Sequence, residues 1–75
     1  MKVLAKFEWE QGQRVGNCEL HAAGQDTSVT GTGSSVPSTV AAMARFLFVH
    51  ADDANSELTL DGYKVRFVWV VRKGR

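Results

Sequence analysis

Apolar and charged residues alternate along positions 63–71, which read Tyr-Lys-Val-Arg-Phe-Val-Trp-Val-Val. The odd positions are all apolar, whereas the even positions begin with Lys64 and Arg66 and become apolar at Val68 and Val70. Alternation in β-branched and aromatic residues predicts a strand, and apolar residues on both faces of its second half predict a central place in a sheet.

Residues 3–9 alternate in the same way, and Gly12-Gln13 is a suitable two-residue hairpin loop between them and a second strand. This loop fixes a register in which apolar residues or glycine face each other, and in which two opposite charges meet on the other face. The expected pairs are Trp9 with Gly16, Phe7 with Cys18, Ala5 with Leu20, Val3 with Ala22, and Lys6 with Glu19.

A second hairpin is indicated by Asp61-Gly62, a dipeptide that strongly favours a tight turn. It joins a strand at 56–60 to the strand that begins at Tyr63. The expected pairs are Leu60 with Tyr63, Leu58 with Val65, and Glu57 with Arg66.

Between the hairpins, residues 23–35 are small and polar and include three glycines, so we expect a mobile loop at 24–35. Pro37 is suited to the first turn of a helix, with Ser35 or Ser38 near the cap. One apolar stripe at helical spacing supports a helix over 36–51; it comprises Val36, Val40, Met43, Ala44, Leu47 and Ala51. Phe46-Leu47-Phe48-Val49 would also suit a strand, but the preceding Ala-Ala-Met-Ala favours helix.

These elements predict one α+β domain over 1–75, of the order ββαββ: hairpin 1–23, flexible loop 24–35, helix 36–51 and hairpin 56–73. We expect a four-stranded, largely antiparallel sheet with one helix packed across one face. The last strand is expected beside the first, which leaves the strands at 14–23 and 56–60 as the edges. One helix, about 10 Å wide, is too narrow to cover four strands spaced by about 4.8 Å.

Composition limits the class of protein. A chain of 75 residues has a small core, and its single cysteine excludes an internal disulfide. The N-terminal residues lack the apolar segment of a signal peptide, and no run approaches the roughly 20 apolar residues of a membrane span. We therefore expect a soluble, cytoplasmic protein without membrane association.

Residue types that carry chemistry are present, but none forms a recognisable site. Cys18 and His21 have half of a metal-ligand spacing, yet strand alternation places them on opposite faces. His50 has no nucleophile placed beside it, and residues 31–35 lack the phosphate-binding signatures. Asp52-Asp53 is typical of a solvated turn. We expect no catalytic residue, metal or cofactor, and therefore no enzyme.

Basic residues gather near the end of the chain, where the last thirteen positions contain no acidic side chain. A nucleic-acid-binding surface is the alternative function that this suggests, and it would use Lys64, Arg66, Arg72, Lys73 and Arg75. Glu57 and Asp61 on the neighbouring strand would weaken its field. A solvated strand end that resists aggregation is the structural explanation.

The leading hypothesis is a non-enzymatic protein-binding module that docks on a partner protein or on a second copy as a homodimer. Apolar surface left open by one helix motivates it, because such patches mark contact surfaces. The expected anchors are Trp69, Phe67 and Trp9 if the inner face is open, and Val68 and Val70 if the outer face is used. In size, element order and absence of catalytic motifs the chain resembles small phage proteins that block host machinery, anti-CRISPR proteins among them. The resemblance implies an inhibitor or adaptor and assigns no residue.

Overall fold

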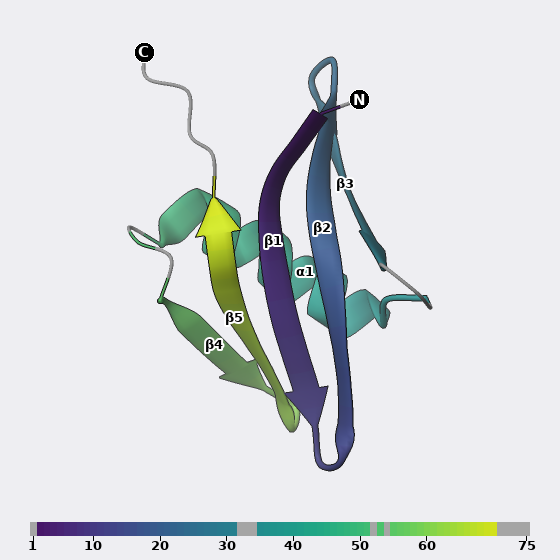
Figure 1. Cartoon of the computed structure of the whole chain (residues 1–75), viewed down its shortest axis with the longest axis vertical. Helices are drawn as coiled ribbons and strands as arrows, with labels where there is room; N and C mark the ends of the chain where they lie inside the picture. The colour runs from purple at the N-terminus through teal and green to yellow at the C-terminus, as the bar shows by residue number, and fades with distance from the viewer. Residues whose placement is uncertain (1, 32–34, 52, 54, 71–75) are drawn as a thin grey trace.

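Five antiparallel strands form one sheet in the described part of the chain, and one helix runs across one of its faces (Figure 1). The computed structural model describes residues 2–31, 35–51, 53 and 55–70, and for positions 69 and 70 it describes the backbone alone. The elements are β1 (Lys2–Gln11), β2 (Arg14–Ala23), β3 (Asp26–Gly31), α1 (Ser38–His50), β4 (Glu57–Leu60) and β5 (Tyr63–Val70).

The α+β class and the single helix across one face are confirmed, whereas the expected number of strands is wrong. The strand order is β3-β2-β1-β5-β4. The last strand, β5, therefore lies beside β1 as expected, and β4 forms one edge. The other edge is β3 and not β2.

The missed strand, β3, lies in the segment that was expected to be a mobile loop. Gly24, at φ 65°, begins a two-residue turn that returns the chain along β2, so that Ala23 pairs with Asp26 and Leu20 with Val29. An edge strand needs little apolar surface of its own, because its backbone hydrogen bonds to β2 hold it in place. The prediction considered only the apolar content of the segment and therefore overlooked this pairing.

Both expected hairpin registers are present. Trp9 lies opposite Gly16, and the pairing continues in the expected register as far as Ala5 and Leu20. In the second hairpin Leu60 lies opposite Tyr63, and the turn residues Asp61 and Gly62 have φ angles of 52° and 82°. Positive φ at both positions is typical of the turn that matches strand twist.

Two bulges interrupt these regular registers. Near the start of β1 the pairing shifts between Val3 and Ala5, so Val3 lies opposite His21 and not opposite Ala22. In the pairing of β1 with β5, Phe7 lies opposite Phe67, but Lys6 lies opposite position 69. One extra residue of β5 is therefore accommodated at Val68, and simple alternation does not continue past it.

The core lies between α1 and the inner face of the sheet, which is the face that α1 covers. The rings of Phe7 and Phe67 stack at its centre with centroids 4.7 Å apart. α1 contributes part of the predicted stripe, and the buried apolar residues are Ala5, Phe7, Trp9, Cys18, Leu20, Val40, Met43, Ala44, Leu47, Val65 and Phe67. The helix begins one residue after Pro37, whose carbonyl accepts a hydrogen bond from the Ala41 amide at 3.0 Å.

Candidate docking surfaces

α1 has a second apolar face on the side that points away from the sheet. Ala42, Phe46 and Val49 are all exposed, with 52 % of Phe46 and 68 % of Val49 accessible. Steps of four and three residues place them on one side of a helix, opposite the buried residues Val40 and Leu47. We call these three residues the outer helix face.

A surface helix normally presents polar and charged residues to water on its outward side. Here Arg45 is the only Lys, Arg, Asp or Glu between Ser38 and His50. The outer helix face therefore exposes apolar area that the fold itself does not use.

The Phe46 ring contacts the ring of His50 on the outer side of α1. The two rings lie 4.2 Å apart between centroids and are tilted by 43°, as expected for residues four apart on a helix. Arg45 is exposed next to Phe46. The outer helix face thus has an exposed aromatic residue with the Arg45 cation next to it in the sequence and the His50 ring in contact with it.

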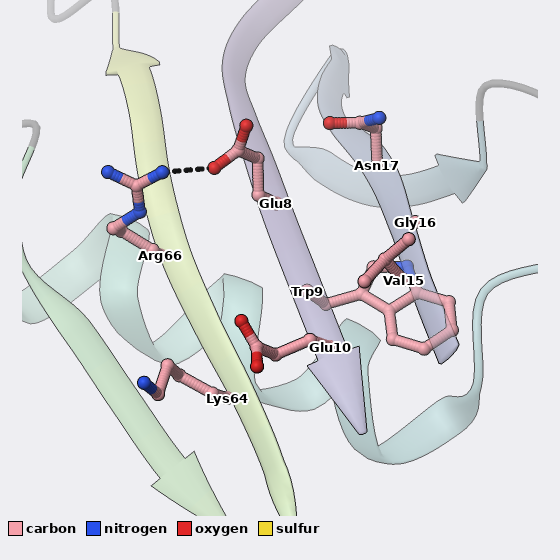
Figure 2. Close-up of a pocket in the computed structure, with 8 residues that line it drawn as sticks. All are labelled: Glu8, Trp9, Glu10, Val15, Gly16, Asn17, Lys64 and Arg66. Atoms are coloured by element: carbon pink, nitrogen blue, oxygen red, sulfur yellow. Dashed lines mark hydrogen bonds and ion pairs between the residues drawn. The ribbon is translucent and has the colours of Figure 1, made fainter. Parts of the chain in front are cut away.

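The outer sheet face, which points away from α1, has a different character. Its charged side chains alternate in sign across neighbouring strands: Glu8 lies opposite Arg66, Glu10 opposite Lys64, and Lys6 opposite Glu19. Arg66 donates a hydrogen bond to Glu8 (Figure 2). An antiparallel sheet can leave such a charge-paired face in water.

A hollow of approximately 360 Å³ lies on this face. Figure 2 shows the Glu8 and Arg66 side chains directed at each other, whereas the Lys64 nitrogen points away from Glu10. Among the described residues, the lining consists of Glu8, Trp9, Glu10, Val15, Gly16, Asn17, Lys64 and Arg66. The formal charges of its two carboxylates and two cations cancel.

Two of the anchors predicted from the sequence, Phe67 and Trp9, are buried. Phe67 and Trp9 are only 1 % and 6 % exposed, so both belong to the core. Their proposed role required an open inner face, and α1, Tyr63 and Arg14 cover them instead; the Trp9 ring lies 6.1 Å from that of Tyr63 and 5.6 Å from the Arg14 guanidinium.

The remaining anchors lie on β5. Val68 is 39 % exposed at the bulge. The side chains of Trp69 and Val70 lie outside the described part of the structure. Their predicted role in binding remains a prediction.

Only part of the predicted basic surface is described. Lys64 and Arg66 are exposed on the outer sheet face, but Glu10 and Glu8 lie opposite them. A phosphate would compete with the Glu8 carboxylate for Arg66. Arg72, Lys73 and Arg75 lie outside the described residues.

Cys18 and His21 take different positions along β2. Cys18 is fully buried, and burial raises the pKa of its thiol to about 11, with the negative charge of Glu19 as a smaller cause. His21 lies with its Nε2 atom 3.3 Å from Glu19 Oε1. Among the described residues, no group of three or more His, Cys, Asp or Glu side chains is placed to hold a metal ion.

The outer helix face was not identified from the sequence, although its signal is present. The apolar stripe predicted from the sequence does not include Ala42, Phe46 or Val49. A second set of apolar residues at 42, 46 and 49 has the same helical spacing as the first. This spacing indicates an exposed apolar face only when the opposite side of the helix is known to pack on the sheet.

Comparisons with known proteins give no match, whether to a family model, to a curated protein or to a solved structure. Within the described residues, no helix has the length and apolar character needed to cross a membrane.

Proposed function

We propose that this chain is a small non-enzymatic binding module that docks on another protein through the outer helix face. The partner segment is an apolar one that also carries acidic side chains. An inhibitor or an adaptor would act in this way, by occupying or bridging a surface of its target.

The exposure of Phe46 and Val49 opposite the packed side of α1 is the observation that carries the proposal. Burying a phenylalanine or valine side chain stabilises a contact by about 1.5–3 kcal/mol. The Phe46 ring contacts that of His50, with 4.2 Å between the ring centroids, and about half of Phe46 stays accessible to a partner. Rigid aromatic residues of this kind often provide most of the binding energy of an interface.

Charge supports an acidic partner over a second copy at this surface. α1 contains no acidic residue, and Arg45 lies near the middle of the helix. Two copies that met face to face through α1 would bring their two Arg45 side chains together, and like charges oppose such contact. An acidic side chain on a different protein would instead pair with Arg45.

Nucleic-acid binding through the basic end of the chain remains the alternative hypothesis. The described residues do not favour it, because Lys64 and Arg66 already face Glu10 and Glu8 across the strands. Binding of that kind would weaken steeply as salt concentration rises. Docking through an apolar helix face depends much less on salt.

The test uses photo-crosslinking from the proposed surface. Phe46 is replaced by p-benzoylphenylalanine in the full chain, and the same residue is placed at Thr59, an exposed position on β4, as the matched control. Irradiation of the cells that naturally produce this protein should give one defined adduct from position 46 and none from position 59. The adduct should disappear when Val49→Asp is added.

The protein found in the adduct is then purified and titrated against the unmodified chain. Phe46→Ala should weaken binding by roughly 30-fold, the factor that corresponds to about 2 kcal/mol for a central interface residue. Thr59→Ala should leave the affinity unchanged. Equal crosslinking from positions 46 and 59, or an affinity that is insensitive to Phe46→Ala, would refute the proposal.

A further inference from the structure

The open edge of the sheet points to a second interaction surface, independent of the outer helix face. We infer that β3 pairs antiparallel with β3 of a second copy of this chain, so that two five-stranded sheets join into one continuous sheet. This pairing would make the protein a homodimer through its sheet edge.

Among the described residues, β3 is the last strand on its side of the sheet and pairs with β2 alone (Figure 1). Its outward edge therefore presents backbone donors and acceptors over residues Asp26–Gly31. Proteins usually protect such edges with lysine, proline, a bulge or a very short strand. β3 has no lysine or proline and no interruption in its pairing with β2, whereas the opposite edge, β4, has only four residues.

The sequence of β3 is complementary to itself in one register. Val29 lies opposite buried Leu20, and Thr30 lies opposite Glu19 of the outer sheet face, so the faces of β3 are known. A two-fold axis at Val29 places Val29 against Val29 of the second copy. It also places Ser28 against Thr30 and Thr27 against Gly31.

This register joins inner face to inner face and outer face to outer face, as a continuous sheet requires. Asp26 is the only charged residue of β3, and it does not lie opposite Asp26 of the second copy. The β-branched Val29 meets its own copy at the axis, which favours strand pairing. No like-charge contact opposes the pairing.

The apolar surroundings of the edge also fit a second copy. Val29 and Val36 are only partly buried and pack against the core beside the β3 edge and the start of α1. Joining two β3 edges about an axis perpendicular to the sheet covers these residues further. It also places both α1 helices on the same side of the combined sheet, so that two outer helix faces point in one direction.

Strand pairing over six residues buries a small area, so we expect a reversible, concentration-dependent dimer. Sedimentation equilibrium of the full chain should show the mass rising from 8.2 kDa toward twice that value as concentration increases. Ser28→Lys with Thr30→Lys should keep the chain monomeric, because each lysine would face another across the axis. Thr59→Lys on β4 is the matched control and should dimerise normally.

A disulfide test reports the register. Under mild oxidation Val29→Cys should crosslink efficiently, because directly opposite residues in a strand pair have Cβ atoms about 4.5–5.5 Å apart, whereas Thr59→Cys should not. Circular dichroism and thermal unfolding verify that each variant is folded. A wild-type chain that stays monomeric at every concentration overturns the inference, and so does a dimer that survives the two lysines but is lost in Phe46→Asp.

Discussion

The indole ring of Trp9 lies directly over the backbone of Gly16, its partner across the β1–β2 hairpin. A Cβ atom at position 16 would lie 2.6 Å from Trp9 Cε2 and Nε1. Atoms of a folded protein do not approach so closely without displacement. The inner face of the hairpin thus accommodates its largest side chain only because the opposite residue has none.

Gly16→Ala is therefore expected to lower the free energy of unfolding by about 1–3 kcal/mol through overpacking. Trp9 is 6 % exposed and held between Tyr63 and Arg14, so its ring has little room to move. Chemical denaturation monitored by tryptophan fluorescence measures the change.

A double-mutant cycle shows whether Gly16→Ala lowers the free energy of unfolding because the new methyl group meets the indole or for a reason unrelated to Trp9. In a Trp9→Phe background the smaller ring leaves space, so adding Gly16→Ala should cost less than in the wild-type chain. Asn17→Ala, at the exposed neighbouring position, should change stability by no more than about 0.5 kcal/mol. Equal costs of Gly16→Ala in both backgrounds would contradict the steric explanation.

Gly62 presents the opposite case, because nothing lies within 4 Å of a Cβ built there. Its φ of 82° is nevertheless in the region that L-residues disfavour. Gly62→Ala should cost about 1–2 kcal/mol from backbone conformation alone, and the loss should be the same in the Trp9→Phe background. Thermal unfolding of the wild-type chain and of Trp9→Phe, each with and without Gly62→Ala, tests whether the two costs are equal.

The ion pair between Glu8 and Arg66 should contribute little to stability. Both side chains are about half exposed, and exposed pairs typically contribute about 0.2–1 kcal/mol. A cycle of Glu8→Ala, Arg66→Ala and the double variant should give a coupling energy in this range that decreases in high salt. A larger, salt-independent coupling would show that the pair organises the sheet face.

Much of the fold could be predicted because both faces of each hairpin agreed on one register. The Trp9–Gly16 and Leu60–Tyr63 pairs follow from turn position and alternation alone, and both are present. The bulges could not be predicted in this way, because they depend on how β1 fits two neighbouring strands at once. A single extra residue at Val68 is enough to end the alternation on which the position of Trp69 was based.

The candidate docking surfaces could be predicted less well, because they depend on which apolar side chains the neighbouring elements already bury. Phe67 and Phe46 have equally apolar side chains, yet one lies in the core and the other is 52 % exposed. β3 shows the same limit, since its position at the edge follows from pairing with β2 and not from its own composition. Sequence patterns identify apolar residues, but the packing of the elements determines which of them remain accessible.

Cys18 makes stability depend on pH in the alkaline range. Its folded pKa of about 11 exceeds the ordinary value of 9.0 for a cysteine, so the folded state retains the thiol proton more strongly. The resulting stabilisation is complete below about pH 9 and is lost as the pH rises toward 11, by roughly 1 kcal/mol at pH 10. Urea unfolding between pH 7 and pH 10 should therefore show a steeper loss of stability for the wild-type chain than for Cys18→Ala, in which the other titrating groups are unchanged. Parallel pH profiles for the two proteins would show that the thiol ionises as easily in the folded chain as in the unfolded one.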